Sequence, residues 1–174
     1  MMLHVAFSQT QRPQDLVYFN GSASVTTNSP FNPNNQQITF QFRTCLGGEL
    51  FSLSDSGKSV SLSVNNTGSV IVTWNSGTGE ESAAVGSMYN VNTWTLIDIR
   101  TVFGAIVVSV RNQNGEDAVI VDLPSLAPTN GFVLGTGYTG CLEEVQGIGL
   151  ASSISWSSVS WGECPLNNQV DCSE

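Results

Sequence analysis

Positive charge is scarce in this sequence, with five Lys and Arg residues against 14 Asp and Glu and a net charge of −9. The five bases are scattered and form no basic run: Arg12, Arg43, Lys58, Arg100 and Arg111. A nucleic-acid-binding protein needs several cationic side chains to neutralise phosphates, so we expect no nucleic-acid partner. The same shortage disfavours anionic membranes and sulfated glycans, while a cationic partner or a divalent cation is electrostatically allowed.

Histidine is nearly absent, because His4 is the single residue of this type and the sole candidate base for a nucleophilic serine. The sequence also lacks a Gly-x-Ser-x-Gly turn, which excludes catalysis of the Ser-His kind. Adjacent acids occur at Glu80-Glu81, Glu116-Asp117 and Glu143-Glu144. Neighbours on a strand point to opposite faces, so such a pair cannot flank one glycosidic bond. We therefore predict that the chain is not an enzyme.

Long apolar runs are missing too, since no run approaches the about 18 residues that a membrane-spanning helix needs. Residues 1–14 lack the basic start and the long apolar stretch of a signal peptide. We expect no membrane insertion by this fragment. We interpret residues 1–14 as an extension or linker, 15–166 as one domain, and 167–174 as a tail or a linker to a following module.

The sequence does contain a clear two-residue periodicity of apolar side chains. Ile38, Phe40 and Phe42 alternate with polar residues, and the same rhythm recurs at 60–64, 70–74, 94–100 and 105–111. Each of these segments reads as a half-buried strand. Turn-forming residues separate them, for example the NNTG run at 65–68. Many short strands at this spacing predict an all-β sandwich or barrel.

Four cysteines are present, Cys45, Cys141, Cys164 and Cys172, and none belongs to a Cys-x-x-Cys pair. This spacing favours disulfides over a zinc site and therefore predicts an oxidising compartment. Asn20 and Asn65 each begin an N-glycosylation sequon, NGS and NNT, at an expected turn or strand edge. Both features indicate an extracellular glycoprotein.

Several segments, in order, resemble laminin G-like domains over residues 16–165. They are VYFNG at 17–21, ITFQFRT at 38–44 with GELF at 48–51, NTW at 92–94 before a strand ending in Arg100, and YTGCLEEV at 138–145 with Cys164. The last segment is the most specific of the set. The resemblance implies two curved antiparallel sheets in a jelly-roll sandwich of the concanavalin or laminin G type.

The resemblance also implies that Cys141 and Cys164 form a closing disulfide. A loop of about 23 residues would then contribute about 3 kcal/mol through the entropy of the unfolded chain. Cys45 and Cys172 have two alternatives. They pair with each other, which we favour, or Cys172 belongs to a following module and Cys45 is free.

Many laminin G-like domains hold one Ca²⁺ at a rim of the sandwich, using an Asp just before a strand that corresponds to 60–64 here. Lys58 occupies the position of that first acid, and an ammonium group cannot ligate calcium. The candidate ligands that are left are Asp55, Asn114 and Asp117, with Asn112 and Glu116 nearby. The sequence therefore departs from the calcium-binding pattern of the family at its first ligand.

These observations predict a non-catalytic recognition or adhesion module, secreted or in the ectodomain of a membrane protein. We expect it to bind an extracellular protein ligand or receptor through its rim loops. The alternative is a lectin-like module that binds a glycan on the same fold. For that alternative, Tyr89 with Asn90 and Asn92 is the one modest candidate for a sugar-stacking group.

Overall fold

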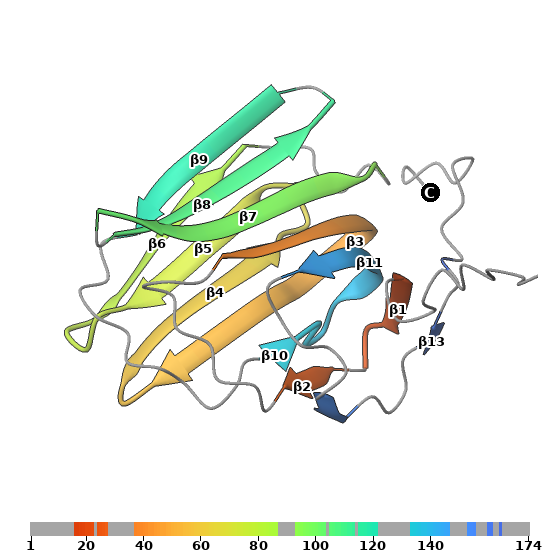
Figure 1. The fold of residues 1–174 in the computed structure, drawn as a ribbon, viewed down its shortest axis with the longest axis horizontal. Helices are drawn as coiled ribbons and strands as arrows, with labels where there is room; N and C mark the ends of the chain where they lie inside the picture. Colours follow the sequence, from red (N-terminus) through yellow and green to blue (C-terminus); the bar gives the residue numbers. More distant parts are fainter. Residues whose placement is uncertain are drawn as a thin grey trace, which may run out of the picture.

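The computed structural model describes residues 16–22, 24–27, 37–86, 93–103, 105–113, 115–121, 133–146, 153–155, 160–161 and 164. All regular elements in these ranges are strands (Figure 1). The ranges contain no helix that is long and apolar enough to cross a membrane. The strands are β1 (Leu16–Asn20), β2 (Val25–Thr27), β3 (Ile38–Asp55), β4 (Lys58–Val64), β5 (Val70–Asn75), β6 (Glu80–Val85), β7 (Thr95–Val102), β8 (Ala105–Asn112), β9 (Gly115–Val121), β10 (Val133–Leu134), β11 (Thr139–Gln146), β12 (Ser153–Ser155) and β13 (Ser160–Trp161).

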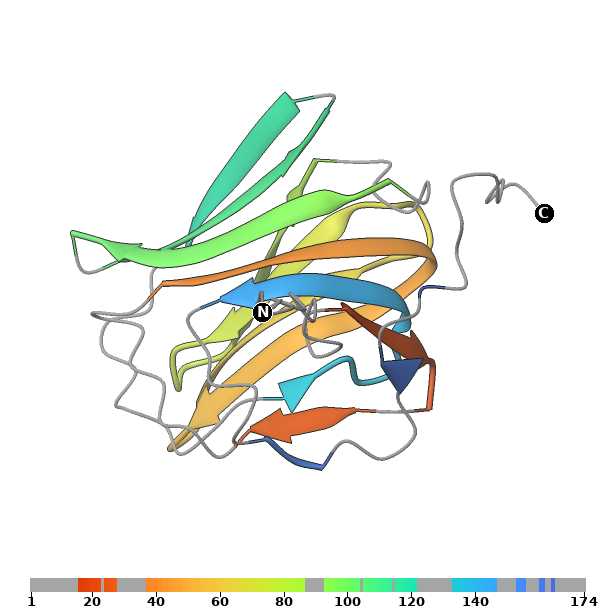
Figure 2. The same ribbon diagram turned by 45° about the vertical axis from the view of Figure 1, so that its right-hand side comes forward.

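Two antiparallel sheets share the long strand β3. The first sheet has the order β13-β1-β11-β3-β7-β8-β9, with the N-terminal half of β3 at its centre. The second has the order β12-β2-β10-β3-β4-β5-β6, with the C-terminal half of β3 at its centre. Figure 2 shows β7, β3 and β11 running side by side in the first sheet. This arrangement confirms the predicted antiparallel two-sheet sandwich.

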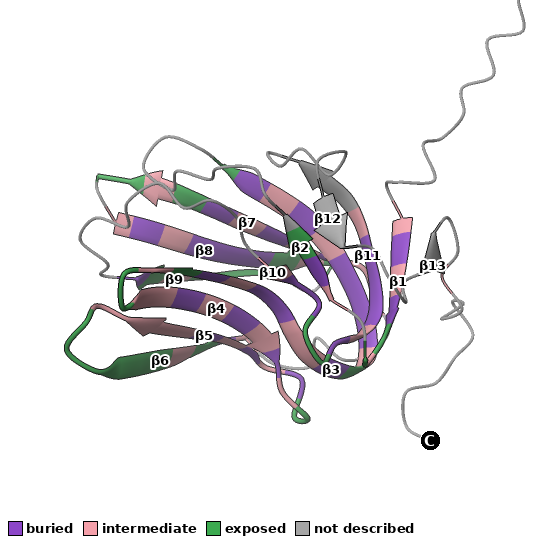
Figure 3. Cartoon of the chain, turned by 90° about the horizontal axis from the view of Figure 1, so that it is seen from below, coloured by how far each residue is buried: buried purple, intermediate pink, exposed green. Residues whose placement is uncertain are grey.

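The strand β3 passes from one sheet to the other through a bend at Gly47 and Gly48, both with positive φ. Figure 3 shows β3 curving between the two layers. A side chain at Gly48 would overlap the backbone of Gly137 and Tyr138 on the segment that leads into β11. Glycine is required here because only a bare backbone allows two chain segments to approach this closely.

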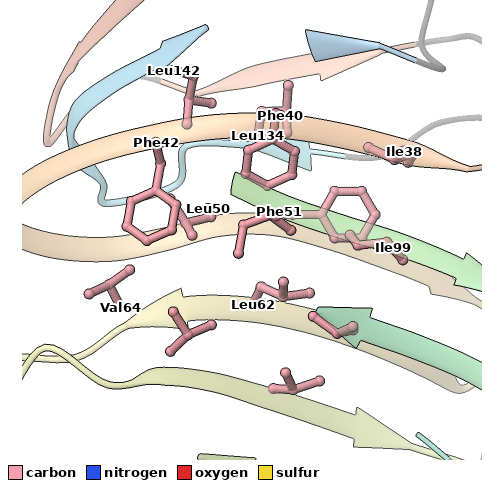
Figure 4. Packing of buried hydrophobic residues seen from close by; sticks show 14 of the residues in the cluster. Ile38, Phe40, Phe42, Leu50, Phe51, Leu62, Val64, Ile99, Leu134 and Leu142 are labelled. Atoms are coloured by element: carbon pink, nitrogen blue, oxygen red, sulfur yellow. The ribbon is translucent and has the colours of Figure 1, made fainter. Parts of the chain in front are cut away.

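The core lies between the two sheets and is built by the alternating side chains. Ile38, Phe40 and Phe42 of the first sheet are fully buried, and Leu50 and Leu62 of the second lie against them (Figure 4). A fully buried side chain of this size contributes about 1.5–3 kcal/mol relative to an exposed one. The two-residue periodicity of the sequence therefore reflects the alternation of core-facing and outward-facing side chains along each strand.

The sandwich has two different ends. We call the end that contains Gly47 and Gly48 the bend end. The turn between β4 and β5 lies there too, because Gly48 pairs with Val64 and Val64 with Val70. We call the opposite end the free rim. It holds the turns that join β3 to β4, β5 to β6 and β7 to β8, seen together on the left of Figure 1.

Candidate binding surfaces

The segment around Tyr138, which carries the most specific part of the resemblance, is a structural element of the bend end. The fully buried Tyr138 hydroxyl lies 3.1 Å from the carbonyl oxygen of Arg43 and 3.0 Å from that of Cys141, so it can donate to either. Its ring packs edge-on against Phe19 at 5.9 Å between centroids. A Cβ at Gly140 would overlap both the tyrosine and the Arg43 carbonyl. The buried Tyr138 therefore joins β1, β3 and β11 as part of the packing of this end.

Arg43 and Thr44, the last two residues of the ITFQFRT segment, form further contacts at the bend end. We call them the RT pair. The buried Thr44 hydroxyl donates to the carbonyl of Thr139 at 2.6 Å and accepts the Gly47 N–H at 2.7 Å. The guanidinium of Arg43 lies 5.8 Å from the centre of the Trp94 ring, a cation–π contact. Burial lowers the pKa of Arg43, and the nearby charge of Glu143 partly offsets this. Arg43 is thus an internal packing residue.

A disulfide joins Cys141 to Cys164, with 5.9 Å between the Cα atoms, which confirms the predicted pair. Cys45 is disulfide-bonded as well. Cys172 lies outside the described residues, so its pairing with Cys45 stays a prediction. The first bond ties the buried end of β11 to residues near the C-terminus, again on the side of the bend.

Both sequons lie at the bend end and share one local geometry. The Oδ1 atom of Asn20 accepts the N–H and the hydroxyl of Ser22, at 3.1 and 2.9 Å. Oδ1 of Asn65 accepts the same two groups of Thr67, at 3.1 and 2.8 Å. In both cases the side-chain nitrogen, which would carry a glycan, is outside these bonds. Glycosylation stays a prediction, with both positions on the same end of the sandwich.

The structure does not bring the calcium candidates together. Asp55 pairs with Lys58 at the free rim, and its Oδ1 accepts the Ser56 hydroxyl. Asp117 lies on β9 towards the bend end, where its Oδ2 accepts the N–H of Gly86 at 2.8 Å and so links the two sheets. Asn114 lies outside the described residues, which contain no group of three or more potential metal ligands among His, Cys, Asp and Glu.

A polar hollow occupies the outward face of the first sheet, on β7, β8 and β9. Its volume is about 240 Å³, and it is lined by Leu96, Asp98, Arg100, Ser109, Arg111 and Glu116. Three cross-strand pairs build it: Asp98 lies opposite Ser109, Leu96 lies opposite Arg111, and Arg111 lies opposite Glu116. Glu116 and its neighbour Asp117 point to opposite faces, as the alternation predicts for adjacent acids.

The charged groups of this hollow are not satisfied by one another. Asp98 accepts a hydrogen bond from the Gln37 amide at Oδ2, 2.9 Å away, while its other oxygen is buried without a partner. Arg100 and Arg111 are exposed, and neither guanidinium makes an ion pair or hydrogen bond with any residue of the described part. The arrangement offers donors and acceptors to a ligand on the same part of the sheet.

An apolar corner adjoins the hollow at the free rim. Large exposed apolar side chains in the described ranges are Leu46, Val102, Phe103 and Ile120, and all but Leu46 lie here. Phe103, at the tip of the β7–β8 turn, is fully exposed and has a positive φ of 50°. Ile120 is 67% exposed and lies opposite Val107, which faces Arg100. We refer to Val102, Phe103 and Ile120 as the apolar corner.

Sequence reasoning overlooked both surfaces. Asp98 and Arg100 alternate with buried Ile97 and Ile99, so their outward direction could be read from the pattern. What could not be read was the strand register that sets them beside Ser109, Arg111 and Glu116. The sugar-stacking candidates Tyr89, Asn90 and Asn92 lie outside the described residues.

Comparison with solved structures identifies the architecture. The LG1–3 region of the laminin α2 chain matches with a TM-score of 0.72 and 18% identity, covering 86% of this chain and 34% of that structure. The chain has a laminin G-like fold. Domains LG4–5 of the mouse laminin α1 chain match this laminin G-like chain with a TM-score of 0.67 and 12% identity, covering 84% of it and 46% of the mouse structure.

More distant likenesses carry less information about this laminin G-like chain. A heptameric SAP-like pentraxin from Limulus polyphemus matches with a TM-score of 0.50 and 13% identity, over 79% of each chain. Comparison of the sequence with family models and with curated proteins gives no match. The chain spans about a third of the laminin α2 structure and under half of the mouse α1 structure. Because these sequence identities are low, the similarity to the laminin structures establishes the fold alone.

Proposed function

We propose that this laminin G-like chain is a non-catalytic recognition module of an extracellular protein and that it binds a protein partner at its free rim. The observation that carries the proposal is Phe103, a fully exposed aromatic side chain on a rim turn. Buried aromatic side chains dominate the energy of protein interfaces, with arginine as their usual companion. Arg100 precedes Val102 of the apolar corner by two residues, so an arginine adjoins the exposed aromatic side chain.

The exposed ring of Phe103 supports a binding role. Its positive φ belongs to the two-residue turn between Val102 and Ala105, and Ser56 has a similar φ in the turn between Asp55 and Lys58. Glycine, asparagine or aspartate would fit such a position with less strain, and an exposed aromatic ring adds a solubility cost. The choice of a large aromatic side chain at this position is therefore consistent with a contact that it makes with another molecule.

The opposite end of the molecule supports the same assignment. Asn20 and Asn65 both lie at the bend end, where glycans would obstruct a partner. The disulfide between Cys141 and Cys164 suits an oxidising, extracellular setting. Glycans at these two positions would lie away from the described turns of the free rim, which join β3 to β4, β5 to β6 and β7 to β8.

The test is a screen of the disulfide-intact protein against an array of purified secreted proteins and ectodomains. We expect a protein partner whose affinity falls more than about tenfold in Phe103→Ser, the range of an interface hot spot. Leu46→Ser is the matched control, because Leu46 is 72% exposed but lies at the bend. A partner that depends on Leu46 and ignores Phe103 would contradict the proposed location, and an array with no partner would contradict the function.

Carbohydrate binding is a second candidate function, favoured by one observation, the hollow on β7 to β9. Saccharide ligands carry many hydroxyl groups, and the hollow contains a buried carboxylate oxygen without a donor. The hollow and the apolar corner are neighbouring surfaces that meet at Arg100. One module could bind a glycosylated protein through both.

A further inference from the structure

We propose that the hollow binds one sugar residue that carries a carboxylate, of the uronic or sialic acid class, at an end or branch of a glycan. This inference goes beyond the protein-binding rim and rests on the second candidate function, carbohydrate binding. It assigns a ligand class to Leu96, Asp98, Arg100, Ser109, Arg111 and Glu116, which line the hollow.

The carboxylate of the sugar is recognised by the two arginines. The guanidinium group presents a planar fork of N–H donors that matches a carboxylate, and such charge-assisted bonds are about twice as strong as neutral ones. Arg100 and Arg111 lie on adjacent strands, one on each side of the row that contains Asp98 and Ser109. Both side chains are exposed and can turn towards a ligand above that row.

The hydroxyl groups of the sugar are recognised by the acceptors between the arginines. Oδ1 of Asp98 is buried and lacks a hydrogen-bond donor, which is a costly state that a ligand hydroxyl would relieve. Glu116 supplies a second carboxylate, and Ser109 a hydroxyl that can donate or accept. Half-buried Leu96 adds an apolar surface for the C–H groups of a sugar ring.

This mixture of groups separates a sugar acid from an acidic peptide. An Asp or Glu side chain of a partner would satisfy the arginines, but it carries no hydroxyl group that could donate to Asp98. A neutral sugar would satisfy the carboxylates and leave both guanidinium groups without an anion. A ligand that has hydroxyls and a carboxylate on one ring satisfies both sets.

Size and overall charge restrict the ligand further. The volume of about 240 Å³ is below the roughly 300–1,000 Å³ of pockets for drug-sized ligands, so it suits a single ring. The chain has a net charge of −9, which repels a long polyanion before it reaches the sheet. The structure therefore favours one charged residue at the end of a glycan over a repeating polyuronate or a sulfated chain.

The experiment uses the disulfide-intact protein with N-acetylneuraminic acid and glucuronic acid methyl glycosides as probes. Their uncharged counterparts, the carboxamide derivatives, serve as ligand controls. Binding is measured by chemical-shift titration, and a glycan array then covers larger ligands. We expect the acids to bind at least tenfold more tightly than the carboxamides, and to weaken as salt is added.

Variants locate the binding on the hollow. We expect Arg111→Gln and Arg100→Gln each to weaken the acids about tenfold, and Lys58→Gln to change the affinity less than twofold. Lys58 is the control because it is a cation at the start of β4, outside the hollow. Asp98→Asn removes a negative charge that repels either anion, so we expect it to strengthen a short poly-glutamate peptide more than the sugar acids, which lose a charge-assisted hydrogen bond from a hydroxyl group.

The outcomes separate the inference from the function on which it rests. Equal binding of acids and carboxamides, or no effect of either arginine substitution, overturns the sugar-acid assignment while carbohydrate binding stands. An array with no glycan bound overturns both. Tighter binding of poly-glutamate than of the sugar acids replaces the ligand with an acidic peptide and overturns the assignment. Thermal unfolding of each variant should match the parent protein, since the arginines are exposed.

Discussion

At the bend end, buried polar groups are used by the fold itself, whereas the hollow on β7 to β9 presents charged side chains on the outward face of the sheet. The hydroxyls of Thr44 and Tyr138 bond to backbone carbonyls of neighbouring strands. The guanidinium groups of Arg100 and Arg111 make no such contact within the described residues. The same sandwich thus has one end whose polar groups stabilise the fold and one surface that we propose for recognition.

The contrast explains why the residues of the sequence signature are not the residues of the proposed binding surfaces. The YTGC segment and the RT pair meet across β11 and β3, where Arg43 pairs with Cys141. Their chemistry is constrained by close packing. Arg100, Arg111 and Phe103 are exposed, so we expect their substitution to leave the fold intact.

The largest effect is expected for Gly48→Ala, which tests the claim that the bend end is closely packed. The new methyl group would overlap the backbone of Gly137 and Tyr138. We expect a loss of more than about 3 kcal/mol in unfolding free energy, or no folded protein. Gly77→Ala is the control, because Gly77 also has a positive φ but a Cβ there meets open space. Similar urea midpoints for the two variants would refute the packing argument.

Loss of the Cys141–Cys164 disulfide should have the next largest effect. The bond closes a separation of 23 residues, for which chain entropy predicts about 3 kcal/mol. We expect Cys141→Ala combined with Cys164→Ala to lower the melting temperature by roughly 6–12 °C. Binding by the apolar corner of the folded variant should be unchanged, because the bond lies on the other side of the molecule. A weaker partner interaction at a temperature where the variant is folded would show that the two regions are coupled.

We expect a gain in unfolding free energy from a substitution at the free rim, where the proposed binding role of Phe103 opposes stability. Phe103→Gly relieves the positive φ and removes an exposed ring, so unfolding free energy should rise by up to about 1 kcal/mol. Ser56→Gly, at the β3–β4 turn with a φ of 49°, gives the same relief without removing an aromatic ring. If only Ser56→Gly stabilises the protein, the Phe103 ring contributes to folding. That result would contradict the contrast between a bend end that serves stability and a free rim that does not.

The smallest effect concerns Glu49, which follows the bend on β3. Burial raises the pKa of its carboxyl, and a hydrogen bond from Thr136 lowers it by less. The folded state therefore binds the proton more tightly, and this group destabilises the protein above its folded pKa but not below the unfolded pKa. Glu49→Gln should raise the melting temperature by no more than about 2 °C at pH 7 and leave it unchanged near pH 4. A gain that persists at pH 4 would assign the effect to something other than ionisation.

The strands could be predicted from the sequence because each depends on local alternation. Ile38, Phe40 and Phe42 are buried as the pattern indicates, and Cys141 pairs with Cys164 as the resemblance implied. The calcium candidates show the limit of such reasoning. Asp55 and Asp117 could be placed in turns or at strand edges, but not at opposite ends of the sandwich, because that depends on how the sheets stack.

By itself the sequence determined the class of fold, which side chains of each alternating strand face the core, and the shortage of positive charge. These follow from the two-residue repeat of a strand and from composition, which need no knowledge of distant contacts. Tertiary structure alone decided that Asp98, Arg100, Arg111 and Glu116 share one hollow, and that Phe103 lies at the end opposite to Asn20 and Asn65. Those neighbours arise from strand register and sheet stacking, which are set by the packing of the whole core.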